Sequence, residues 1–144
     1  MDAAGFNLDT WKNLTLTYKH LEHLIDAFMP RTRRNNTYCK TLSGVSDERI
    51  KSVRTIDGLR EVFNNDRYHK VNFEAYSRHR TVEFRQHSGT TNFTKMENWI
   101  RFLNGLITFA KRSSLPSRMT LEELPFLDGK QKLFFKLRTK KLAV

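Results

Sequence analysis

The sequence predicts an α+β domain in which several helices pack on a small antiparallel sheet. Two long stretches carry apolar residues at helical spacing, and two short segments between them alternate as strands do. The 144 residues amount to one domain's worth of chain. The apolar share of 38%, with eleven Phe, is enough for a core and excludes a wholly disordered chain.

The first helix is expected over residues 9–28, with Asp9 as its N-cap. Its apolar residues are spaced three and four positions apart, which places them on one stripe. The stripe comprises Trp11, Leu14, Tyr18, Leu21, Ile25 and Phe28. A basic loop over 31–39 follows, and shorter helices are expected from Ser46 and over Thr55–Phe63.

Two strands are expected at Val71–Tyr76 and Thr81–Gln86, joined by a turn at Ser77–Arg80. Both segments alternate, so together they indicate an antiparallel hairpin. In the second strand, Glu83 and Arg85 share one face, two positions apart. Because two strands alone make a marginal sheet, they must pair with other backbone or lie beneath the helices.

Two longer helices are expected in the C-terminal part. One spans 94–111 and opens on the capping-box pattern Thr94-x-x-Glu97. Its buried stripe is expected to comprise Met96, Trp99, Ile100, Leu103, Ile107 and Ala110. The other spans 128–140, is capped by Asp128, and is expected to be anchored on the core by Leu133, Phe134 and Leu137.

Positive charge is the strongest compositional feature of the chain. Lys and Arg number 26 against 15 Asp and Glu, which gives a formal net charge of +11. From Lys130 to Lys141 there are six cations and no anion, interleaved with apolar residues. Such a segment can dock on the domain while its cations face phosphate, or it can be a solvated tail that only aids solubility. The overall charge favours an anionic partner: nucleic acid, nucleotide, acidic substrate or lipid surface.

Several classes of protein are excluded. The single cysteine, Cys39, rules out an internal disulfide and a Cys-rich zinc site. The sequence has no run of about 18 apolar residues and no signal-peptide pattern at its start, so a cytoplasmic protein without membrane contact is expected.

The segment from Arg80 to Thr90 holds the richest set of reactive side chains. A carboxylate such as Glu83 can ligate Mg²⁺, and a guanidinium such as Arg85 can hold a carboxylate or phosphate through two hydrogen bonds. A polar, Gly-containing turn then leads into the next helix. The alternative is a simple ion pair between Glu83 and Arg85, worth under about 1 kcal/mol.

Three segments resemble the amidoligase family of glutamine synthetase-like carboxylate–amine ligases: they are MDAAGFNLDTWKNL, RTRRNNTYCK and RTVEFRQHSGTTNFTKMENWIRFLNGLI. The resemblance covers roughly residues 1–112, and residues 113–144 are expected to form a basic helical extension packed on the same domain. It implies the C-terminal half of a glutamine synthetase-like domain, because the family's His-x-His strand and other metal carboxylates precede the matching part. It also implies an ATP-dependent ligase, in which an amine captures an acyl phosphate.

The resemblance assigns roles at the matching positions. Glu83 matches the strand glutamate that ligates a catalytic metal, and Arg85 matches the arginine that holds substrate or phosphate. Arg33, Arg34 and Asn36 match the polar loop over nucleotide and substrate, with Arg33 and Asn36 as the cofactor-binding pair. ATP and Mg²⁺ are implied as cofactors only if the chain is an active ligase.

Two functions therefore stand side by side. The preferred one is a non-catalytic accessory protein without a cofactor that binds nucleic acid or a nucleoprotein complex. It is expected to be a homodimer, or to pair with another chain, because an incomplete sheet leaves an open edge. The alternative is an amidoligase or a subunit of one, which requires more metal carboxylates than the sequence offers. The binding residues expected for the first function are Arg31, Arg33, Arg34, Lys132, Lys136, Arg138 and Lys140.

Overall fold

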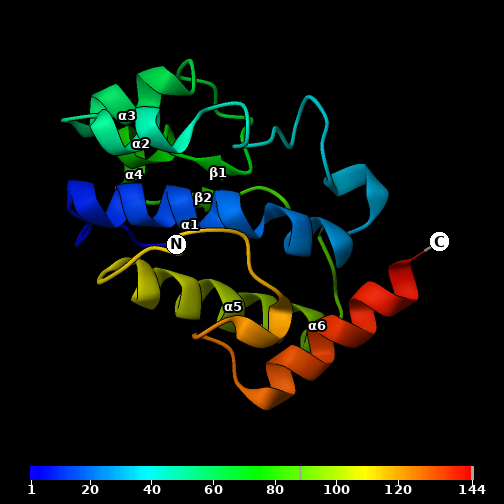
Figure 1. Cartoon of the computed structure of the whole chain (residues 1–144). Helices are drawn as coiled ribbons and strands as arrows, with labels where there is room; N and C mark the ends of the chain where they lie inside the picture. Colours follow the sequence, from blue (N-terminus) through cyan, green and yellow to red (C-terminus); the bar gives the residue numbers. More distant parts are fainter. Residues whose placement is uncertain (88, 144) are drawn as a thin grey trace.

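The computed structural model of the chain describes residues 1–87 and 89–143 and confirms the α+β class. Figure 1 shows α1 (Leu8–Ala27) in the middle of the molecule, with the sheet and short helices on one side and α5 (Phe93–Ala110) and α6 (Gly129–Leu142) on the other. The shorter elements are η1 (Arg31–Arg33), α2 (Asp47–Ser52), α3 (Ile56–Val62), α4 (Ala75–His79) and η2 (Leu121–Glu123). No helix of the described residues is long and apolar enough to cross a membrane.

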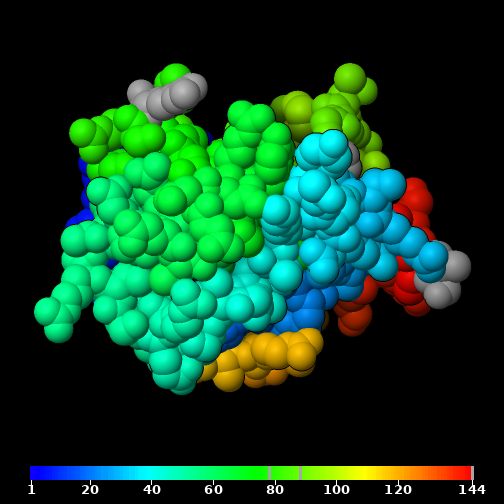
Figure 2. All heavy atoms as spheres, turned by 90° about the horizontal axis from the view of Figure 1, so that it is seen from above, coloured from blue at the N-terminus to red at the C-terminus, as the bar shows by residue number. Residues whose placement is uncertain are grey.

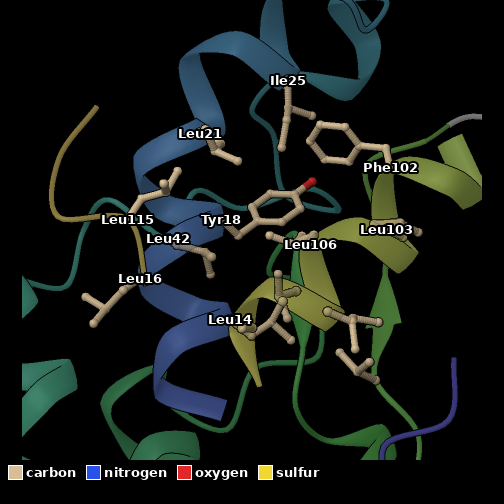
Figure 3. Packing of buried hydrophobic residues seen from close by; sticks show 14 of the residues in the cluster. Leu14, Leu16, Tyr18, Leu21, Ile25, Leu42, Phe102, Leu103, Leu106 and Leu115 are labelled. Atoms are coloured by element: carbon tan, nitrogen blue, oxygen red, sulfur yellow. The ribbon is translucent and has the colours of Figure 1, made fainter. Parts of the chain in front are cut away.

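The central helix, α1, forms where its apolar stripe predicts, and all six stripe residues are buried. Its N-cap is Asn7 in place of the expected Asp9, because the Asn7 side chain accepts a hydrogen bond from the Thr10 N–H at 2.8 Å. Figure 3 shows Tyr18 of α1 lying beside Leu106 of α5, so the stripe packs against that helix. The central helix therefore packs mainly on other helices and less on the small sheet.

Two expectations for α5 are wrong. The helix is capped by Asn92, whose side chain accepts from the Lys95 N–H at 3.1 Å, so Thr94 lies inside the helix. Met96 and Ile100, expected to be buried, are exposed. The reason is that the buried face of α5 is rotated about the helix axis relative to the expected one. This face comprises Trp99, Phe102, Leu103, Leu106, Ile107 and Ala110.

The last helix, α6, is capped by Asp128 as expected. Phe135 anchors it, with its ring centroid 4.4 Å from that of Phe28 at the end of α1. Leu133 and Leu137 do not anchor the helix, because they are 56% and 57% exposed.

The sheet is shorter than expected. β1 (Val71–Asn72) pairs antiparallel with β2 (Glu83–Phe84), and Asn72 lies opposite Glu83. Residues 75–79 form α4 in place of a longer strand, and Arg80, in the left-handed conformation, ends that helix. Two isolated bridges extend the backbone pairing: Asp2 with Thr81, and Lys40 with His69.

A buried lysine ties α1 to the sheet. The side chain of Lys70 is fully buried, with its Nζ 3.2 Å from a Glu22 oxygen and 2.9 Å from an Asp26 oxygen. Gln86 donates to Asp26 at 2.5 Å, and the Tyr18 hydroxyl donates to Gln86 at 2.8 Å. Burial, together with the two carboxylates, raises the pKa of Tyr18 well above its usual range. The hydroxyl therefore stays protonated and serves as a fixed donor under the sheet.

Candidate functional site

A cleft of about 730 Å³ lies beside the sheet, between the strand ends, the loop after α3 and the start of α4. Its volume falls in the range of ligand-binding pockets in proteins. Its charged lining comprises Arg60, Arg67, Arg85, Glu74 and Glu83. The structure therefore brings Glu83 and Arg85 together, as the sequence predicts, and adds a second glutamate and two further arginines.

Glu74 is held by Arg60 of α3. The Arg60 guanidinium donates from Nε at 2.6 Å and from Nη2 at 2.9 Å, so the pair is bidentate. Hydrogen bonding to Glu74 also raises the pKa of Arg60, against the opposing effect of burial. The charge of the Glu74 carboxylate is therefore balanced by Arg60, and the ion pair joins α3 to the start of α4.

Glu83 is held by Arg85, its neighbour on the same face of β2. The Arg85 Nη1 donates to Glu83 at 2.5 Å, and Asn72 across the sheet donates to the same oxygen at 3.4 Å. Arg85 also donates from Nε to the Tyr38 carbonyl at 3.3 Å. The ion pair between Glu83 and Arg85 is thus present in the structure, and their binding of metal or phosphate stays a prediction.

The described residues do not by themselves fit a two-metal site. None of their His, Cys, Asp and Glu side chains gather in groups of three or more that could hold a metal ion. Both glutamates of the cleft already bind arginines, whereas Mg²⁺ is bound by carboxylates that offset its charge. Glu83 as a metal ligand stays a prediction.

Sequence reasoning missed the aromatic part of the site. The guanidinium carbons of Arg67 and Arg85 lie 4.9 and 5.1 Å from the centroid of the Tyr68 ring. Tyr38, which is 61% exposed, meets Tyr68 edge-on at 5.6 Å. Arg85 was expected in the site and Tyr38 lies in the segment RTRRNNTYCK, but their contacts with Tyr68 depend on the packing of distant segments. We call Tyr38, Tyr68, Arg67 and Arg85 the arginine–tyrosine cluster.

The loop over 31–39 holds the backbone of the arginine–tyrosine cluster in place through hydrogen bonds. Asn36 accepts hydrogen bonds from the backbone N–H of Tyr38 at 2.9 Å and of Cys39 at 3.1 Å. The buried Cys39 thiol donates to the Arg85 carbonyl at 3.3 Å and lies 3.8 Å from Arg33. Neither Arg33 nor Asn36 lines the cleft. Their proposed contact with nucleotide stays a prediction, while their contacts here support the backbone that carries Tyr38.

The remaining expected binding residues lie mostly at one end of the molecule. Arg31 is exposed, and Arg34 donates to the Met29 carbonyl at 3.0 Å. Figure 2 shows this loop, in cyan, and α6, in red, at the same end. On α6, Lys132 donates to the Glu122 carbonyl at 2.8 Å, and Arg138 lines a small pocket beside Met29. Lys136 and Lys140 are exposed on the same helix.

The polar turn that follows Arg85 includes Ser88, which lies outside the described residues. Of its neighbours, His87 stacks on Trp99 with ring centroids 5.3 Å apart. Thr90 accepts a hydrogen bond from the Asn92 N–H at 3.0 Å, which leads the chain into α5.

A family model described as "Putative amidoligase enzyme" matches residues 1–107. Since this match covers well over half of the chain, the chain belongs to the amidoligase family. The resemblance of the sequence motifs to the amidoligase family is thereby confirmed, whereas the likeness to half of a glutamine synthetase-like domain stays a prediction. Both η2 and α6 lie beyond the match. Comparison with curated proteins and with solved structures gives no significant match.

Proposed function

We propose that this chain is a non-catalytic member of the amidoligase family that binds nucleic acid, alone or within a nucleoprotein complex in the cytoplasm. The observation that carries the proposal is the arginine–tyrosine cluster at the cleft. Proteins that bind single strands stack bases on aromatic rings and place cations along the backbone. Tyr38 is exposed and meets the Tyr68 ring, over which Arg67 lies. The cluster therefore offers a ring for stacking and, in Arg67, a cation that has no ion-pair partner among the described residues.

The charge of the chain supports the same partner. The net charge is +11, and the cleft itself carries three arginines against two glutamates. Each cation that contacts a phosphate releases condensed counterions, so binding of this kind weakens as salt rises. The cations of the 31–34 loop and of α6 extend the positive surface beyond the cleft.

The pairing of both cleft glutamates favours binding over catalysis. A two-metal phosphoryl-transfer site needs carboxylates that face the metal ions. Here Glu74 and Glu83 each face a guanidinium within 2.9 Å. An active ligase would have to release at least one of these pairs, whereas a binding cleft keeps them.

The proposal includes a homodimer. Phe93, Met96 and Ile100 lie three and four positions apart on α5, which places them on one stripe, and all three are exposed, Phe93 by 71%. Exposed apolar patches of this kind mark protein interfaces, and a two-fold pair is the simplest way to cover one. Light scattering should give twice the 17.1 kDa chain mass at micromolar concentration, and Ile100→Glu should return the single-chain mass. A single-chain mass for the wild type would remove the dimer from the proposal.

The binding proposal is tested with fluorescent single-stranded DNA, single-stranded RNA and duplex DNA at several salt concentrations. Tyr38→Ala should weaken single-strand binding about tenfold, since one stacked base contributes ~1–3 kcal/mol and tenfold is about 1.4 kcal/mol. Tyr38→Phe is the matched control, because it keeps the ring and should keep the affinity.

Two results would overturn the binding proposal. One is a wild type that binds none of the three nucleic acids. The other is ATP hydrolysis by the wild type with Mg²⁺ that is lost in Glu83→Gln, because this result supports the ATP-dependent carboxylate–amine ligase instead.

A further inference from the structure

A second, smaller pocket of about 110 Å³ lies where α6 covers the chain that leads into α5. We call it the α5–α6 pocket. Its polar lining comes from His87 and Thr90 before α5, Lys95 in its first turn and Arg138 on α6, while Phe28 and Phe135 form apolar walls. It shares no lining residue with the cleft. Figure 1 shows α6 crossing beside the end of α5.

The charge in this pocket is one-sided. Lys95 and Arg138 are its permanent cations, and none of its described lining residues is acidic. Among the described residues, neither side chain has an ion-pair or hydrogen-bond partner, in contrast to Arg60 and Arg85 in the cleft. Two cations that line one small pocket repel each other, and an anion between them replaces repulsion by attraction.

The size of the pocket limits the anion. Its volume of about 110 Å³ is roughly a seventh of the 730 Å³ of the cleft. The small volume therefore favours a small anion, such as a single phosphate group, over a whole nucleotide. A phosphate monoester carries about −1.5 to −2 at pH 7, which the two cations balance.

The donors present match phosphate chemistry. A guanidinium binds phosphate oxygens through two parallel hydrogen bonds, and an ammonium adds a point charge. Thr90 already accepts from the Asn92 N–H at 3.0 Å, which leaves its hydroxyl hydrogen to donate. The pocket thus combines two cations and one neutral donor from α5, α6 and the segment before α5.

We propose that the α5–α6 pocket binds a phosphate monoester, the 5′-terminal phosphate of a nucleic acid strand. Free phosphate offers the same chemistry, and the experiment separates the two sources. Arg138 lies beyond the family match at residues 1–107, so the site is an addition of this chain to the family domain. The site stands on its own residues and does not depend on nucleic acid binding at the cleft.

The test compares two single strands of one sequence, each labelled at the 3′ end, one with a 5′-phosphate and one with a 5′-hydroxyl. The phosphorylated strand should bind about tenfold more tightly. Arg138→Ala and Lys95→Ala should each bring the affinity ratio of the two strands close to one. Lys141→Ala on α6 and Lys111→Ala after α5 are matched controls, because they remove the same charge outside the pocket and should keep the ratio. Thermal unfolding of each variant shows that the fold is retained.

Inorganic phosphate alone is the second probe, followed by amide NMR shifts. It should shift the amides of Gly89, Thr90 and Lys95, and Arg138→Ala should abolish these shifts. A ratio of one in the wild type without such shifts overturns the proposal, as do shifts that Arg138→Ala leaves intact. If neither strand binds but phosphate still shifts these amides in an Arg138-dependent way, the ligand of the pocket is free phosphate, and both the 5′-phosphate assignment and the proposed function are overturned.

Discussion

The two concave sites of this molecule use cations in opposite ways. In the cleft, Arg60 and Arg85 each bind a glutamate. In the α5–α6 pocket, Lys95 and Arg138 have no acidic partner among the described residues. The cleft lies within the family match, whereas the pocket needs a helix beyond it. The comparison teaches that a paired cation fixes the shape of a site, and an unpaired one is left to bind a ligand.

Lys70 is the most buried of the paired cations, and its replacement is expected to lower stability more than any other change proposed here. Lys70→Met leaves the buried Glu22 and the partly buried Asp26 without their counter-charge, which should lower the free energy of unfolding by about 3–5 kcal/mol. Urea denaturation at pH 7 measures this loss. The exposed Lys111→Met is the control and should change stability by under about 0.5 kcal/mol. A loss below about 1 kcal/mol for Lys70→Met would show that this pairing does not hold the core.

The helices were the predictable part of the fold, because the spacing of their apolar residues involves only residues that are close in sequence. The strands were overestimated for an equally local reason. The Asn72 side chain accepts a hydrogen bond from the Glu74 N–H at 2.9 Å, which turns the chain out of the strand and into α4. The alternation of apolar and polar residues that begins at Val71 therefore continues into residues that fold as a helix, and the strand was predicted too long.

The site was predictable only where its members are neighbours in sequence. Glu83 and Arg85 stand two positions apart on β2, and their proximity follows from strand geometry. Arg60 meets Glu74 from another helix, and Tyr38 reaches Tyr68 from another loop. Those contacts depend on how distant segments pack, which no spacing in the sequence reveals.

The second-largest effect is expected on nucleic acid affinity when cations of α6 are removed. It tests whether cations of this helix are available to bind a ligand. The variant replaces four residues by Ala: Lys132, Lys136, Arg138 and Lys140. It should weaken nucleic acid binding at least about tenfold at low salt. It should also flatten the slope of log affinity against log salt by roughly one unit for each phosphate that the helix no longer binds. Binding of a labelled duplex and a labelled single strand across a salt series measures both. A helix that only aids solubility would leave affinity and slope unchanged.

A smaller effect concerns the acid that positions the arginine–tyrosine cluster. Asp66 binds Lys40 and accepts from the Tyr68 N–H at 2.8 Å, and the hydrogen bond from Lys40 holds the pKa of Asp66 below its ordinary value. A lowered pKa in the folded state means that this stabilisation is present above the unfolded pKa, near 4, and is lost as pH falls. Asp66→Asn should therefore cost about 1 kcal/mol at pH 7, and the gap to wild type should shrink below about pH 4. A gap that stays constant down to about pH 2.5 would contradict the assignment.

The smallest effect on stability is expected for Glu83→Gln, which changes a half-exposed glutamate of the cleft. Glu83 is 48% exposed and receives one short hydrogen bond from Arg85, so its loss of charge should change stability by under about 0.5 kcal/mol. Gln keeps an oxygen that accepts from Arg85, and removing one negative charge from a cleft that binds an anion should leave single-strand affinity equal or slightly higher. Glu74→Gln is the matched variant, and it should cost more stability because Glu74 is only 20% exposed and bound at two points. Urea denaturation and strand binding of both variants measure the difference. Weaker strand binding in Glu83→Gln with Glu74→Gln unaffected would mean that Glu83 itself contacts the ligand, and the paired residues of the cleft would then do more than fix its shape.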